Sequence, residues 1–146
     1  CTPDEILEEI LSGLRLRSRV NKTLGPGTAD VRLRMPKTGL AQALRGIVQN
    51  ALDASPSGQT VDLTAETSGK RLRIVCRDRG PGMPDEVLAR AGEPFFTTKG
   101  VGRGMGLGLF LARSVIERLG GTLELASSHD PAQPGTTVTI HLPVVG

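Results

Sequence analysis

The chain has 146 residues, which suits one globular domain and is too short for two domains with separate cores, so we expect residues 1–146 to form a single domain. Eighteen Lys and Arg against fifteen Asp and Glu give a net charge of +3, which tolerates a phosphate-bearing partner without requiring one. With no Trp, no Tyr and three Phe, the chain lacks the aromatic side chains on which many nucleic-acid readers stack bases, so we expect no nucleic-acid partner.

Cysteine usage and hydropathy indicate the compartment. Cys1 and Cys76 are too few for a disulfide framework or a four-ligand zinc site, which favours a reducing cytoplasm. The longest nearly apolar stretch, residues 106–112, is far shorter than the roughly 20 residues of a membrane helix, so we expect this domain to make no membrane contact. Because the chain opens at Cys1 directly on a helix signal, we expect a fragment of a longer protein, which could be membrane-anchored elsewhere.

The first third of the chain predicts a helix, a strand and a second helix. Thr2-Pro3-Asp4-Glu5 has the pattern of a capping box, and the apolar spacing that follows predicts a helix to about Val20. Apolar and polar residues alternate over residues 30–35, which predicts a half-buried strand. Apolar residues then recur every three or four positions over residues 40–52, and Pro56-Ser57-Gly58 ends this helix.

The middle of the chain predicts a hairpin, a short helix and a lid. Two alternating runs on either side of Ser68-Gly69 predict the hairpin over residues 60–77. Pro84-Asp85-Glu86 predicts a short helix to about Ala91. No period survives over residues 92–104, and an unpatterned segment of this length favours a functional lid.

The last third predicts one helix and two strands. A stripe at helical spacing consists of Leu107, Leu111, Val115 and Leu119, and Gly120-Gly121 ends it. Residues 122–127 and 136–142 then predict two strands that close the domain.

Two motifs place polar residues where a structural pattern does not require them. Asn50 and Asp53 lie one turn apart near the end of the second helix and offer oxygen ligands to hydrated Mg²⁺; a solvent-facing polar pair is the alternative. Asp78-Arg79-Gly80-Pro81-Gly82 follows a buried strand, where the carboxylate could accept from an exocyclic amine and the glycines lie against a ring. An ordinary turn is the alternative.

Two further motifs lie in and after the predicted lid. Gly104-Met105-Gly106-Leu107-Gly108 leads into a helix whose first, unpaired amides could cradle an anion, with Lys99 and Arg103 beside it; a flexible loop is the alternative. The run lacks the spacing of the Walker and dinucleotide glycine motifs. Phe95 and Phe96 could latch the lid onto the core, or could simply pack within it.

In this order the four motifs resemble those of one family. Residues 46–56, 78–84, 93–99 and 102–110 resemble the N, G1, F and G2 boxes of the ATP-binding catalytic domain of bacterial sensor histidine kinases, in the GHKL or Bergerat group. The resemblance covers nearly the whole chain, including Gly120-Gly121 and the ending from Gly135 to Pro143. Within the G2 box, the run Gly-Met-Gly-Leu-Gly-Leu-Phe is similar to that of the redox-responsive RegB/PrrB-like branch.

The resemblance implies an α/β (α+β) two-layer sandwich: a mixed, mostly antiparallel sheet with about three helices on one face, and ATP between the second helix and the lid. Asn50 would bind Mg²⁺ and bridge it to the phosphates, Lys99 would approach the γ-phosphate, and Asp78 would accept from the adenine amine. The nucleotide-binding residues that it implies are Asn50, Asp53, Asp78, Gly80, Gly82, Phe95, Phe96, Thr98, Lys99, Arg103, Gly104, Met105, Gly106, Leu107, Gly108 and Thr136.

Two positions depart from the family pattern. Gly46 stands where the family often has a second Asn, and Asp53 replaces a common Lys, so that the helix also looks similar to gyrase, MutL and Hsp90 ATPases. Those ATPases place a Glu four residues before the Asn to activate water. Because Gly46 offers no base at that position, we expect slow intrinsic hydrolysis.

The resemblance implies a function in two-component signalling: the domain donates the γ-phosphate of Mg-ATP to a histidine on its own dimerisation and phosphotransfer domain, which passes it to a response regulator. His129 and His141 fall in a predicted turn and a predicted strand, and neither suits the acceptor role. Two alternatives remain: a GHKL ATPase or serine-kinase-type nucleotide switch, and a scaffold domain that binds no nucleotide.

Overall fold

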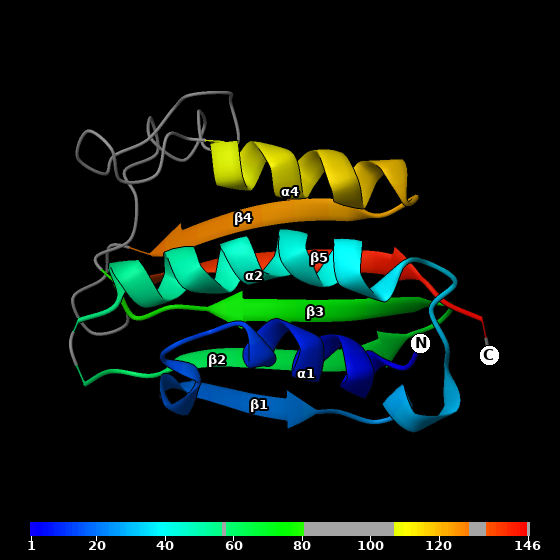
Figure 1. The fold of residues 1–146 in the computed structure, drawn as a ribbon, viewed down its shortest axis with the longest axis horizontal. Helices are drawn as coiled ribbons and strands as arrows, with labels where there is room; N and C mark the ends of the chain where they lie inside the picture. Colours follow the sequence, from blue (N-terminus) through cyan, green and yellow to red (C-terminus); the bar gives the residue numbers. More distant parts are fainter. Residues whose placement is uncertain (57, 81–106, 129–133, 146) are drawn as a thin grey trace.

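The computed structural model of the chain describes residues 1–56, 58–80, 107–128 and 134–145 (Figure 1). The regular elements of these residues are, in chain order, helix α1 (Pro3–Ser12), strand β1 (Val20–Leu24), helix α2 (Lys37–Ala54), strands β2 (Val61–Ser68) and β3 (Arg71–Arg77), helix α4 (Leu107–Arg118), and strands β4 (Thr122–Ser128) and β5 (Gly135–Pro143). Two single turns of 3₁₀-helix, at Arg17–Arg19 and Thr28–Asp30, flank β1. The predicted helix over residues 84–91 and the predicted lid over residues 92–104 lie outside the described residues.

The five strands form one sheet in the order β1-β2-β3-β5-β4. Strand β1 runs parallel to β2, and the other neighbouring pairs are antiparallel. Helices α1, α2 and α4 lie side by side on one face of this sheet, with α2 in the middle in contact with both of the others (Figure 1). The predicted two-layer sandwich with a mixed, mostly antiparallel sheet is therefore confirmed.

The core lies between the helices and the inner face of the sheet. On β2 and β3 every second residue is buried, as the alternating patterns predict, and the register pairs Leu63 with Cys76 and Ala65 with Ile74. Helix α2 buries an apolar stripe against them, consisting of Leu40, Ala41, Leu44, Ile47, Val48, Ala51 and Leu52. The predicted second helix, the hairpin and the two closing strands are all present within two or three residues of the expected bounds.

Two predictions at the start of the chain are wrong. The first helix ends at Ser12 rather than near Val20, because Arg45 of α2 donates to the carbonyl groups of Glu9 and Ile10 and so satisfies the end of α1 from outside. Val20 instead begins β1, a five-residue strand with one neighbour in the sheet.

Residues 30–35 form no strand. Their backbone makes one isolated bridge, in which Arg32 and Val145 exchange both of their hydrogen bonds at 2.8 and 2.9 Å. Leu33 is buried, but the 3₁₀ turn before it and the α2 start after it leave no room for a ladder of several residues.

Helix α4 is where it was predicted, but its buried face is not the predicted stripe. Ala112 and Ile116 are fully buried, whereas 57% of Leu111 is exposed. Both sets of residues recur at helical spacing, so this mostly apolar helix carries two candidate stripes, and packing against α2 and β4 selects one of them. No helix in the described parts of the chain combines the length and hydropathy that crossing a bilayer requires.

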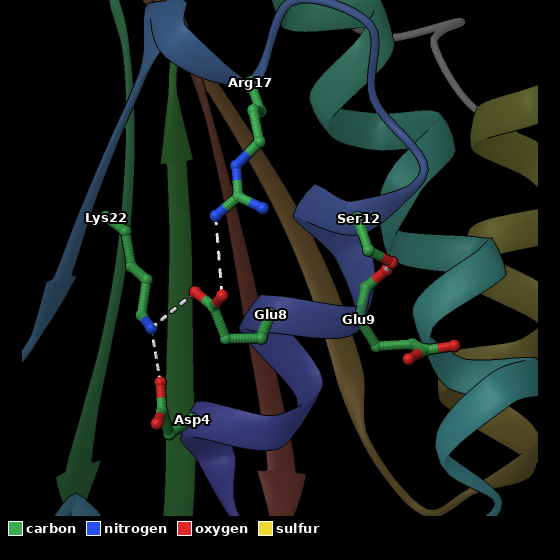
Figure 2. A network of polar contacts seen from close by, with 6 residues as sticks. All are labelled: Asp4, Glu8, Glu9, Ser12, Arg17 and Lys22. Atoms are coloured by element: carbon green, nitrogen blue, oxygen red, sulfur yellow. Dashed lines mark hydrogen bonds and ion pairs between the residues drawn. The ribbon is translucent and has the colours of Figure 1, made fainter.

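A polar network ties α1 to the edge strand β1 (Figure 2). The Lys22 ammonium group contacts the carboxylate of Asp4 and lies 2.7 Å from that of Glu8, while Arg17 lies 3.4 Å from Glu8. The hydrogen bond from Lys22 and the two positive charges hold the pKa of Glu8 below its usual value of 4.5. Burial opposes the charged form of Lys22, but the hydrogen bonds to Asp4 and Glu8 outweigh it and raise the pKa of Lys22.

This network predicts a pH-dependent contribution to stability. Lys22→Met keeps the apolar stem and removes the charge, and we expect it to lower the free energy of unfolding by about 0.5–1 kcal/mol at pH 7 and low salt. Because the pKa of Glu8 is lowered in the folded state, its contribution is present above pH 4.5 and is lost as the pH falls through the folded pKa. Urea unfolding at pH 7 and pH 3 measures the loss of unfolding free energy in Lys22→Met at each pH. Lys70→Met is the control, because Lys70 is exposed. A Lys22→Met difference that is unchanged at pH 3 would contradict the assignment.

Candidate functional site

The Asp78 carboxylate lies at the end of β3 and is fixed by two main-chain amides. Its Oδ1 accepts from the N–H of Gly80 at 3.0 Å and from the N–H of Thr136 at 2.9 Å. The Asp78 N–H in turn donates to the Thr136 carbonyl at 3.0 Å. Asp78 is 7% exposed, and no group of the described residues donates to its second oxygen, Oδ2. One of the two carboxylate oxygens thus fixes how the side chain is oriented.

Gly135 allows β5 to come this close to Asp78. Its φ of +143° lies in a region that residues with a side chain rarely adopt, and a Cβ atom at this position would collide with the Asp78 carbonyl oxygen. The prediction of site residues included Thr136 but missed Gly135. The sequence could have indicated Gly135, because a glycine immediately before a predicted strand often marks a close approach of two backbones.

The turn after Asp78 packs on the last turn of α2. A Cβ atom on Gly80 would lie 2.6 Å from the Ala54 carbonyl oxygen and 3.1 Å from its Cβ, so only a glycine allows this contact. The Arg79 N–H donates to the Ser55 hydroxyl oxygen at 3.1 Å. Asn50 lies four residues before Ala54, on the same helical face and about 6 Å closer to the N-terminus of the helix. The residue expected to bind the metal therefore lies on the helix face over which the Asp78 turn closes.

The Asp53 side chain contacts the preceding turn of its own helix. Asp53 is exposed, and its Oδ1 accepts from the Gln49 side-chain amide at 2.9 Å, one turn back on the same helix. Asn50 is half-buried. The described residues contain no group of three or more His, Cys, Asp or Glu that could hold a metal ion. A metal at this place would thus take an amide oxygen from Asn50 and fill its other positions with phosphate oxygens and water, which suits Mg²⁺.

Of the remaining predicted site residues, the structure describes two. Leu107 and Gly108 form the first turn of α4, whose N-terminus lies at the same end of the sandwich as the end of α2 and the start of β5 (Figure 1). The others lie outside the described residues: Gly82, Phe95, Phe96, Thr98, Lys99, Arg103, Gly104, Met105 and Gly106.

Cys76, two residues before Asp78, offers no nucleophile to this end of the sheet. Burial raises the pKa of its thiol to about 12, and the carboxylates of Asp78 and Asp62 add to the shift. The thiol is therefore neutral at physiological pH, and it packs as an apolar residue against the core.

The family follows from the sequence comparison. Residues 35–146 match the family described as "Histidine kinase-, DNA gyrase B-, and HSP90-like ATPase", and the chain belongs to this family. Relatives include Sporulation kinase B of Bacillus subtilis, 38% identical over 73% of this chain and 24% of its own length. The sensor histidine kinase RegB of Cereibacter sphaeroides is 36% identical over the same two shares. RegB is thus among the relatives, as the G2 box suggests, although other kinases match at similar identity.

Solved structures give the same result for the fold. The mycobacterial sensor histidine kinase MprB superimposes with a TM-score of 0.83 at 27% identity, over 99% of this chain and 95% of that one. The catalytic domain of the histidine kinase ThkA, in a nucleotide-free form, has a TM-score of 0.79 at 26% identity, over 98% and 93% of the two chains. The fold is therefore that of an ATP-dependent histidine kinase catalytic domain. The chain spans about a quarter of the length of Sporulation kinase B and of RegB.

Two glycines of this region predict opposite effects on stability. Gly80→Ala forces a Cβ against the Ala54 carbonyl, and we expect it to lower the free energy of unfolding by about 1–3 kcal/mol. Gly46 lies inside α2 with nothing within 4 Å of an added Cβ, so Gly46→Ala is expected to raise that free energy by about 1 kcal/mol. Urea unfolding measures both variants, and effects of the same sign would show that the turn does not pack on α2 as described.

Proposed function

We propose that this domain binds Mg-ATP between the end of α2 and the Asp78 turn, and donates the γ-phosphate to a histidine on a separate dimerisation domain of the same longer protein. That histidine would pass the phosphoryl group to a response regulator, in the cytoplasm. The main support is the Asp78 carboxylate, which two main-chain amides hold at Oδ1 beside the face of α2 that carries Asn50.

On the base side, Oδ2 of Asp78 accepts from the exocyclic amine of adenine, while Gly80 and Thr136 flank the ring. A carboxylate that cannot rotate discriminates well, because a ligand without the amine leaves its buried oxygen unpaired. The proposal also assigns Gly82 to the base side, where the lack of a side chain would leave room for the ring.

On the phosphate side, the amide oxygen of Asn50 would hold Mg²⁺, which when bound neutralises charge on the phosphates. The proposed partners of the phosphates are the first amides of α4 and the run that precedes it, from Arg103 to Gly108. Lys99 approaches the γ-phosphate, with Thr98 beside it, and Phe95 and Phe96 anchor the segment that closes over the nucleotide.

This site supplies positioning and charge rather than a nucleophile, which is what phosphoryl transfer requires of the donor side. Gly46 lies four residues before Asn50 on the same helical face and carries no base that would activate water. His141 lies in the interior strand β5, with its Nδ1 3.5 Å from the Thr122 hydroxyl. The acceptor is therefore supplied by another domain, and intrinsic hydrolysis is slow.

Calorimetry with ADP tests the two halves of the site separately. Asp78→Asn presents an amide N–H₂ in place of the accepting oxygen, and we expect affinity to fall by about tenfold to a hundredfold both with Mg²⁺ and with a chelator. Asn50→Ala is expected to lower affinity only when Mg²⁺ is present. The control is Asp30→Asn, an exposed carboxylate on the 3₁₀ turn after β1. Wild-type protein that binds no ADP at millimolar concentration would favour the scaffold alternative.

Phosphotransfer in trans tests the reaction. With radiolabelled ATP and an added histidine-bearing dimerisation domain from a relative, we expect label on that domain that is labile in acid and stable in base. Release of free phosphate without such label would instead support the ATPase or nucleotide-switch alternative, to which the gyrase-like N-x-x-D pattern at Asn50 and Asp53 also points.

A further inference from the structure

The turn that carries Asp78 is tied to the rest of the domain at a second place, through Arg79. The Arg79 guanidinium reaches the start of β2, where it donates to the Thr60 carbonyl and, at 3.1 Å, to the Thr60 hydroxyl. Its other nitrogen lies 3.0 Å from the Asp62 carboxylate. That carboxylate is itself held on its second oxygen by the Asn21 side chain, at 3.3 Å. Arg79 thus uses its planar fork to join the turn to the start of β2.

The main chain of Arg79 joins the same turn to the end of α2. Its N–H donates to Ser55, which is 7% exposed and whose own N–H continues the helix by donating to Ala51. Arg19 holds this loop from the other side, because its guanidinium donates to the carbonyl groups of Ser55, Pro56 and Gln59 at 2.9–3.4 Å. The loop between α2 and β2 is therefore held by hydrogen bonds from two arginines, and the Asp78 turn contacts it through Arg79.

This arrangement sets the distance between the two halves of the site. The bonds to Oδ1 of Asp78 fix how the carboxylate is rotated, but they come from Gly80 in the same turn and from Thr136 in β5. Neither of them ties the turn to α2, on which Asn50 lies. That tie consists of the packing of Gly80 on Ala54 and of the contacts of Arg79 with Ser55, Thr60 and Asp62.

We propose that Arg79 is a positioning residue for base recognition. By bracing the Asp78 turn against the α2–β2 loop, it keeps Oδ2 of Asp78 where the exocyclic amine must lie in a purine nucleotide whose phosphates are held at Asn50. The inference rests on the proposed function and adds a residue that touches no ligand. Side chains of Arg79 and Asp62 are 38% and 36% exposed, so the ion pair itself contributes little to the stability of the fold. Its effect should accordingly appear in recognition of the base rather than in folding.

The test compares two nucleotides that differ at the position that Asp78 reads. ADP carries an exocyclic amine, and inosine diphosphate carries an oxygen in its place. We expect the wild-type chain to prefer Mg-ADP in calorimetry. In Arg79→Ala we expect affinity for Mg-ADP to fall by about tenfold while affinity for Mg-IDP changes by less than about twofold, so that the preference shrinks.

Three further variants separate positioning from general damage. Arg79→Lys can reach Asp62 or Thr60 but not both, and should restore part of the preference. Asp62→Asn should shift the preference in the same direction and add nothing to Arg79→Ala in the double variant. Arg71→Ala is the matched control, because Arg71 is exposed at the opposite end of β3 and has no ion-pair partner among the described residues. The urea midpoint of each variant reports on the fold independently.

Each outcome decides the matter. A loss of the same factor for both nucleotides in Arg79→Ala, or an unchanged preference in both Arg79→Ala and Arg79→Lys, would overturn the positioning role while leaving the proposed function intact. If Arg79→Ala does not fold, Arg79→Lys and Asp62→Asn carry the same comparison. Wild-type protein that binds neither nucleotide would overturn the proposed function, and this inference with it.

Discussion

The site depends on one carboxylate oxygen that is held by two main-chain amides from parts of the chain 56 residues apart, Gly80 and Thr136. This pairing requires β5 to approach the end of β3 so closely that only glycine fits at position 135. The turn that follows Asp78 also packs against Ala54, where again only glycine fits, at position 80. A buried polar group is costly to maintain unless its partners are in place, so this pairing makes strict geometric demands on both glycines.

The described residues suit the donor side of the proposed phosphoryl transfer. Cys76 is neutral because burial raises its pKa, Gly46 offers no base, and the described histidine, His141, lies in the sheet. In the proposed reaction the domain would lower the barrier by holding phosphates and neutralising their charge, and the attacking histidine would come from another domain.

Elements with strong local periodicity could be predicted from the sequence, and elements that depend on distant partners could not. The α2 stripe and the hairpin are defined by residues within a few positions of each other. Strand β1 has few apolar residues, and its partner β2 lies 41 residues away; the end of α1 is set by Arg45, from another helix. In the site, family motifs indicated Asp78, Gly80 and Thr136, whereas Arg79 and Ser55 act through contacts that no local pattern reveals.

The most direct test of the account is a titration of the ¹⁵N-labelled chain with Mg-ADP, followed by two-dimensional NMR. We predict that the backbone amides of Gly80 and Thr136 and the side-chain amide of Asn50 shift together and give one dissociation constant. The amide resonances of Arg32 and Val145, which pair with each other beyond the end of β5, should not shift. Separate dissociation constants for Asn50 and for the Gly80 and Thr136 pair, or shifts confined to one of the two groups, would show that they do not form a single nucleotide site.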